Sequence, residues 1–168
     1  MKRIAFVVLV ALAVGGVVMW MRSGSDEERI RGQLTRLAAA LRMEEGTNAL
    51  MRAGKMRSEM GAIFDEDVRA NVPELPVALP NKRSELADTA TQLSMMFRSI
   101  DVDFSDIEVK LDDARQTARV GATVKLSSTG RAGPTRDSRA TDFLFNKRDG
   151  TWRIASVTVW AKGDAPPP

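Results

Sequence analysis

The residues that could carry chemistry in this chain of 168 residues are its carboxylates, because the sequence contains no His, no Cys and no Tyr. Their absence excludes Ser-His-Asp and Cys-His hydrolases, disulfides and the usual tetrahedral zinc site. A carboxyl that is buried among apolar side chains can have a raised pKa and act as a lone general base. The aspartates in positions that allow this role are Asp67, Asp101, Asp103, Asp106 and Asp142.

These aspartates also have a plainer interpretation, which we favour. Asp101, Asp103 and Asp142 lie on the polar side of segments that read as half-buried strands, and Asp67 suits a turn or a cap. The spacing of Asp101, Asp103 and Asp106 lacks the glycine and the distal glutamate of a calcium-binding loop. The sequence therefore predicts no catalytic residue, no metal site and no cofactor.

A second group of side chains could line a pocket for a small apolar or lipid-like ligand. Methionine adapts to irregular apolar shapes, and ligand pockets are lined mainly by apolar and aromatic groups. The alternative is ordinary core filling, which methionine at helical spacing more often indicates. The pocket candidates are Met56, Met60, Phe64, Leu93, Phe97, Phe104, Phe143 and Trp152.

The charge pattern argues against a nucleic-acid partner. The 25 basic residues are nearly balanced by 22 acidic ones, with a net charge of +3. The basic residues are scattered and form no stripe interleaved with aromatic side chains. Arg131, Arg136 and Arg139 belong to an expected polar loop around residues 127–138, where they could grip an acidic partner or lipid headgroups, or simply face solvent.

Three helices are expected to position these groups. Ser25 and Glu28 form a capping box, which predicts a helix from residue 26. Apolar residues at helical spacing then predict a second helix from residue 48 to about residue 64 and a third from Asn81 to about Phe97. A short extended piece at residues 68–72 and three prolines separate the second helix from the third.

From residue 100 the apolar period changes to two, which predicts strands. The alternation reverses at Ser105 and Asp106, as expected of a β-bulge, and the pair Asp149-Gly150 predicts a hairpin turn. The expected fold is therefore α+β, with three helices packed on a curved sheet of four antiparallel strands. The long strands are expected at residues 100–111, 118–126, 140–147 and 152–160.

The last strand carries apolar residues of both parities. Trp152, Ile154 and Trp160 are expected on one face, and Val157 and Val159 on the other. An antiparallel sheet that is covered on one side only should have a polar second face. The apolar residues on the second face therefore predict that this face is covered. It either binds a partner, which is a second copy of the chain or another protein, or it encloses a pocket. The partner-surface candidates are Val157, Val159 and Trp160.

The N-terminus predicts a membrane anchor. Residues 4–21 form an apolar run without charge, preceded by Lys2 and Arg3 and ending beside Trp20. A helix of this length roughly spans the hydrocarbon core of a bilayer, and an indole is favourable at the interface. A cleaved signal peptide is the alternative, but no small-x-small site follows the run. We expect a single pass of the inner membrane, with the domain outside it and periplasmic in a Gram-negative host.

The order of elements resembles the nuclear transport factor 2-like superfamily, also called SnoaL-like or cystatin-like cone proteins. The local match is an apolar strand from Phe143 that runs into Lys147, Asp149-Gly150 and then Trp152. The resemblance implies a cone that hosts enzymes as well as binding modules. In the ketosteroid-isomerase branch the base precedes a proline, and here Val72 occupies that position. The oxyanion tyrosine of that branch is absent as well.

These observations predict an anchor at residues 1–22, a spacer at 23–25, a nuclear transport factor 2-like domain at 26–161 and a disordered tail at 162–168. The leading hypothesis is a membrane-anchored, non-catalytic interaction or assembly module, attached through residues 4–21 and binding a partner through its sheet. The alternative is a carrier or sensor of a small apolar ligand. The third is an enzyme with a lone carboxyl base.

Overall fold

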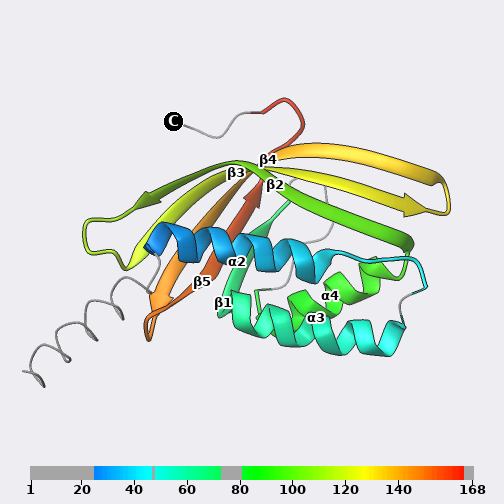
Figure 1. The fold of residues 1–168 in the computed structure, drawn as a ribbon, viewed down its shortest axis with the longest axis horizontal. Helices are drawn as coiled ribbons and strands as arrows, with labels where there is room; N and C mark the ends of the chain where they lie inside the picture. Colours follow the sequence, from blue (N-terminus) through cyan, green and yellow to red (C-terminus); the bar gives the residue numbers. More distant parts are fainter. Residues whose placement is uncertain (1–24, 47, 73–80, 165–168) are drawn as a thin grey trace, which may run out of the picture.

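The computed structural model describes residues 25–46, 48–72 and 81–164, which form three helices and one sheet (Figure 1). The capped helix α2 (Asp26–Leu41) is followed by α3 (Ala49–Ile63) and strand β1 (Phe64–Asn71). Helix α4 (Arg83–Ser94) comes next. The long strands follow in the order β2 (Phe97–Leu111), β3 (Thr117–Gly130), β4 (Gly133–Arg148) and β5 (Thr151–Val159).

Helix α2 begins as its sequence predicts. The Ser25 hydroxyl accepts a hydrogen bond from the Glu28 amide at 3.2 Å, and the Ser25 amide donates to the Glu28 carboxylate at 3.0 Å. This reciprocal pair satisfies two of the amides that an isolated helix end leaves unpaired. The apolar stripe of the helix is buried completely at Ile30 and Leu34. The capping box is therefore confirmed.

The sheet has five strands rather than the four that we expected. Its order is β1-β5-β4-β3-β2, and β1 pairs in parallel with β5, so the sheet is mixed and not purely antiparallel. The prediction placed a short extended piece at residues 68–72 but not in the sheet. Its partner is the last strand of the domain, with Ala70 opposite Val157, and local sequence does not reveal so distant a pairing.

The expected polar loop at residues 127–138 is wrong. Strands β3 and β4 continue through it as a long antiparallel hairpin, in which Ser127 pairs with Arg136 and Gly130 with Gly133. The hydroxyls of Ser128 and Thr135 lie 2.8 Å apart across this arm. Polar residues therefore form strands here, because backbone hydrogen bonds between β3 and β4 stabilise the segment although it buries few apolar side chains.

Two predicted local features are confirmed. The register of β2 and β3 shifts between Ser105 and Glu108, and Asp106 has a φ of 53°, which is a β-bulge. Asp149 and Gly150 have φ angles of 51° and 75°, as the tight turn between β4 and β5 requires. The bulge restores the inward direction of the apolar residues in the second half of β2, so that Ile107 packs against the core.

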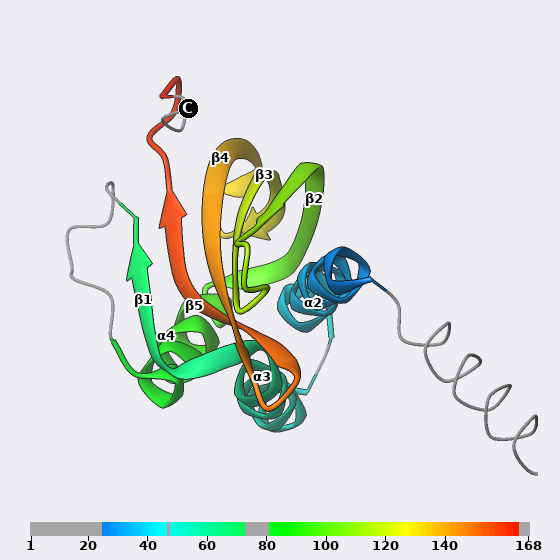
Figure 2. The same cartoon turned by 90° about the vertical axis from the view of Figure 1, so that its left-hand side faces the viewer.

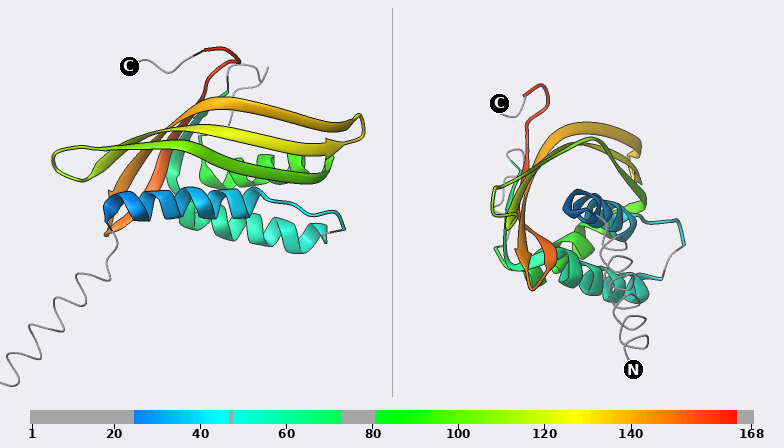
Figure 3. Two further views of the ribbon diagram at one scale, coloured as in Figure 1. Left: turned by 45° about the horizontal axis from the view of Figure 1, so that its top comes forward. Right: turned by 60° about the vertical axis from the view of Figure 1, so that its left-hand side comes forward.

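The sheet curves around α2, and α3 and α4 lie side by side across the open side of that curve (Figures 2 and 3). Residues of the sheet, of α2 and of the α3–α4 pair form one hydrophobic core. Its largest fully buried side chains include Trp152 and Phe145 from the sheet and Ile63 from α3.

A charged cluster fixes the start of α2 to the sheet. The Asp26 carboxylate accepts hydrogen bonds from Lys147 Nζ at 2.9 Å and from Trp152 Nε1 at 3.0 Å. The Lys147 ammonium also lies 5.3 Å from the centre of the Trp152 ring. These two donors hold the pKa of Asp26 below its usual value.

Among the described residues, no helix is long and apolar enough to cross a bilayer. The predicted anchor at residues 4–21 lies outside the described part of the chain. So do the spacer residues 23 and 24 and the tail residues 165–168.

Candidate functional site

A cavity of about 420 Å³ lies between the helices and the concave face of the sheet. Helix α2 contributes Leu37 and Leu41 to its wall, and α4 contributes Leu86 and Ala90. Every strand of the sheet contributes at least one residue. The volume falls in the usual range of roughly 300–1,000 Å³ for small-molecule sites.

Four of the eight predicted pocket residues line this cavity: Met60, Phe64, Phe104 and Phe143. The rings of Phe104 and Phe143 meet edge to face, with their centres 5.8 Å apart. This contact connects β2 to β4 across β3, and the two rings form an aromatic part of the cavity wall.

The other four predicted pocket residues lie elsewhere. Met56 is buried in the core, and Trp152 borders a different pocket. Leu93 is 45% exposed, and the ring of Phe97 lies beside Gly130 in the β3–β4 arm. Apolar character alone did not separate cavity positions from core or surface positions, because apolar residues occupy all three.

Val157 and Val159 also line the cavity rather than the outer face of the sheet. The register of β4 and β5 shifts, so that Leu144 pairs with Ser156 and the next residue, Phe145, pairs with Ile154. Ala155 has no place in that register, so the alternation restarts after it. The expectation that the two valines face away from Ile154 is therefore wrong.

The outer face of the sheet carries many charged and hydroxyl side chains. A hollow on it is lined by six of these, together with Leu144, which is 37% exposed, and with Val120, Gly121 and Phe143. Trp160 donates a hydrogen bond from Nε1 to Asp142 Oδ2 at 2.9 Å. The two valines predicted on this outer face therefore contribute nothing to it, because they turn inward to the cavity.

One side of the cavity carries polar groups, all from β4: Asp137, Arg139 and Thr141. Arg139 Nε donates to Asp137 Oδ2 at 2.8 Å, and this bond holds the pKa of Asp137 below its usual value. Thr141 is buried, and its hydroxyl has no hydrogen-bond partner.

The sequence prediction did not group these three residues, because it began the strand at residue 140 and so placed Asp137 and Arg139 outside the strand that contains Thr141. They share the parity of Phe143 and Phe145, both of which are buried. The signal that could have found them is this alternation, continued from Phe143 back to residue 137. Arg139, interpreted above as a loop charge, is therefore a strand residue.

None of the five candidate aspartates lines the cavity. Asp67 and Asp101 pair with surface cations, Lys82 and Arg42. The remaining two of β2 are exposed, and Asp142 accepts the bond from the last tryptophan. Among the described lining residues, Asp137 is the only carboxylate. Its lowered pKa makes it a weaker base than an isolated aspartate.

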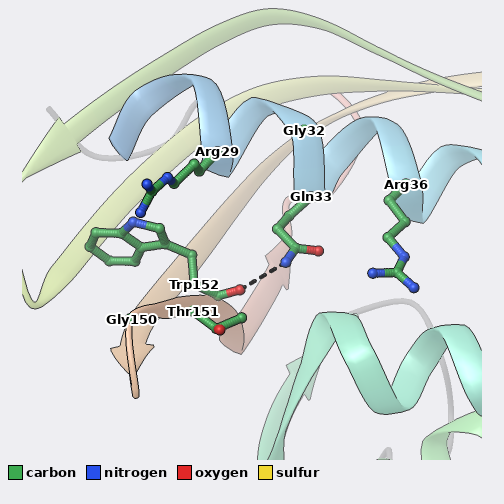
Figure 4. A pocket seen from close by; sticks show the side chains of 7 residues that line it. All are labelled: Arg29, Gly32, Gln33, Arg36, Gly150, Thr151 and Trp152. Carbon is green, nitrogen blue, oxygen red and sulfur yellow. Dashed lines mark hydrogen bonds between the residues drawn. The ribbon is translucent and has the colours of Figure 1, made fainter. Parts of the chain in front are cut away.

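A second pocket of about 380 Å³ lies outside the concavity, between α2 and the turn that leads into β5 (Figure 4). Arg29, Gln33 and Arg36 project into it from one side of α2. Gln33 Nε2 donates to the backbone oxygen of Trp152 at 3.1 Å, and Arg36 is paired with Glu59 of α3. Gln33 and Arg36 thus join α2 to β5 and to α3, so we regard the apolar cavity as the candidate site.

The fold is shared with solved structures of low sequence identity. A protein of unknown function from Nostoc punctiforme, described as having a cystatin-like fold, is 12% identical over 82% of this chain and 91% of its own, with a TM-score of 0.57. The chain has a cystatin-like cone fold. That result agrees with the predicted nuclear transport factor 2-like superfamily at the level of fold.

Two further structures with this cone fold come from other bacteria. A proposed scytalone dehydratase from Novosphingobium aromaticivorans is 14% identical over 80% of this chain and 82% of its own, with a TM-score of 0.61. Rv3472 of Mycobacterium tuberculosis, whose function is unknown, is 18% identical over 80% and 75%, with a TM-score of 0.62. No family model and no curated protein matches the sequence.

Proposed function

We propose that this cone-fold domain binds a small apolar ligand in its concavity, as a carrier or a sensor. The cavity of about 420 Å³ carries this proposal. Eighteen described residues line it, and fifteen of them are apolar. Burying an apolar ligand against such walls is favourable by roughly 25 cal/mol for each Å² removed from water.

The leading sequence hypothesis, an interaction module, has less support than this alternative. It was based on an apolar outer face at Val157 and Val159, and both residues line the cavity instead. A homodimer or a protein partner held through the sheet stays a prediction. The charged and hydroxyl groups of the outer face suit a polar interface better than an apolar one.

We also propose that residues 4–21 tether the domain to the inner membrane, with the cone on the extracytoplasmic side. A carrier beside a membrane would meet apolar molecules that leave or enter the bilayer. The proposal includes no catalysis. The Asp137–Arg139 pair lowers the pKa of the one carboxylate that the described cavity wall contains, which is the opposite of what a general base near neutral pH needs.

The test is to identify what the cavity holds when the full chain is isolated in an amphipathic polymer. Organic extracts of the purified protein would be compared by mass spectrometry with extracts of the Val157→Trp variant, in which the indole fills the cavity. We expect an apolar compound that accompanies the wild-type chain in fixed proportion and is missing from that variant.

The matched control is Leu144→Trp, which adds the same indole to the outer face of the neighbouring strand. It should keep the compound. Equal amounts of bound compound in all three proteins would overturn the proposal, because the compound would then lie outside the cavity. A wild-type chain that neither retains nor binds any apolar compound would overturn it as well.

A further inference from the structure

The cavity wall contains a polar group that the protein leaves unsatisfied. Thr141 is 1% exposed, and its Oγ1 atom has no hydrogen-bond partner in the structure. Burying a hydroxyl without a partner is unfavourable, because the group loses its hydrogen bonds to water and gains none in return. Its strand neighbours at this level are Ala122 and Val159, and neither side chain can donate or accept a hydrogen bond.

The only charged groups of the described cavity wall neutralise each other. Asp137 and Arg139 form an ion pair at the same side of the cavity as Thr141. Arg139 is shielded, with 18% of its side chain exposed. A carboxylate ligand would place a second anion beside this pair and would lose its own hydration on entering the apolar site. The wall therefore favours a neutral ligand.

We infer that the ligand is a neutral apolar molecule with a hydroxyl or carbonyl group that bonds to Thr141 Oγ1. A threonine hydroxyl both donates and accepts, so either group can satisfy it. The apolar remainder of the ligand then contacts the aromatic wall at Phe104 and Phe143. This inference rests on the proposed function and adds the chemical class of the ligand and the residue that selects it.

Three bicyclic probes of one shape test the inference: naphthalene, 2-naphthol and 2-naphthoate. The affinity of each for the full chain in amphipathic polymer would be measured by calorimetric titration, with protein-free polymer as the blank. One net hydrogen bond corresponds to a change of roughly threefold to tenfold in affinity. We expect 2-naphthol to bind more tightly than naphthalene by that factor, and 2-naphthoate to bind more weakly than 2-naphthol.

The variant Thr141→Val keeps the shape of the side chain and removes its hydroxyl. It should bind naphthalene as the wild type does and lose the preference for 2-naphthol. Thr141→Ser keeps a hydroxyl and should retain that preference. The matched control is Thr158→Val, which makes the same replacement on the outer face of β5 and should change no affinity.

The outcomes separate this inference from the proposed function. Equal binding of naphthalene and 2-naphthol by the wild type, or an unchanged preference in Thr141→Val, would overturn the role of Thr141 and leave apolar binding intact. Tighter binding of 2-naphthoate than of 2-naphthol would overturn the neutral class of ligand. Failure of all three probes to bind the folded chain would overturn both proposals.

Discussion

The two ends of the β4–β5 hairpin face the same helix but are built in opposite ways. At the packed end, which we define by Asp26, Phe145, Lys147, Trp152 and Ile154, the side chains interlock and the polar atoms of the charged cluster are paired. At the hollow end, which we define by Thr141, Val157 and Val159, the cavity lies between the strands and α2, and the threonine hydroxyl is unpaired.

This difference indicates where stability and function reside. Side chains that fill a core contribute through both apolar burial and the absence of voids. Side chains that line a cavity contribute less to stability, because they lack packing contacts on the side that faces the empty space. We therefore expect the packed end to contribute most of the stability of the domain, and the hollow end to contact the proposed ligand.

Removing the indole from the packed end should have the largest effect. Trp152→Ala leaves a large void and removes the bond to Asp26, so we expect a loss of about 3–5 kcal/mol in the free energy of unfolding. Urea denaturation followed by circular dichroism measures it. A loss below about 1 kcal/mol would show that the packed end does not carry the stability of the domain.

Breaking the charged cluster should cost less. Asp26→Asn removes the anion that Lys147 and Trp152 share, and hydrogen bonds to charged groups contribute roughly 1.5–3 kcal/mol each. Because asparagine keeps one side-chain oxygen that can still accept a hydrogen bond, we expect a total loss of about 2 kcal/mol in the same denaturation experiment. The matched control is Asp113→Asn in the exposed β2–β3 turn, which should change the free energy by less than about 0.5 kcal/mol.

Trimming the hollow end should have a smaller effect than either. Val157→Ala removes two methyl groups from a wall that already borders empty space, so we expect a loss of about 1 kcal/mol. Affinity for naphthalene should fall by a similar free energy, because the ligand loses the same contacts. A loss of stability as large as that of Trp152→Ala would contradict the distinction between the two ends.

Acid should weaken the packed end by a modest amount. The pKa of Asp26 is lower in the folded chain than its usual value of 3.8, because of its bonds to Lys147 and Trp152. This group stabilises the fold fully above its unfolded pKa, and the contribution is lost as pH falls through the lowered folded value. Unfolding free energies measured at several acidic pH values should therefore fall less steeply in Asp26→Asn than in the wild type. Parallel curves for the two proteins would contradict this role of Asp26.

Much of the fold follows from local sequence. The capping box at Ser25, the bulge at Asp106 and the turn at Asp149-Gly150 each depend on residues within a few positions of one another. A short stretch of sequence is therefore enough to predict the backbone conformation of each of these three features. The order of three helices and four long strands follows from the change in apolar period at about residue 100.

The candidate site depends more on tertiary contacts. Met60, Phe64, Phe104 and Phe143 were among the predicted pocket residues because they are apolar. Asp137, Arg139 and Thr141 were not. Asp137 and Arg139 read as loop residues, and only the pairing of β4 with its neighbouring strand shows that they share one face with Thr141.

The sequence by itself determined the three helices and the central parts of the four long strands, what chemistry is excluded by the lack of His, Cys and Tyr, and that an apolar run precedes the domain. The tertiary structure decided which way the last strand faces. One shift of register near Ala155 turns Val157 and Val159 from the outer surface into the cavity. A strand has a period of two, so a single extra residue reverses every side chain that follows it. Only pairing with the neighbouring strand shows where that residue lies.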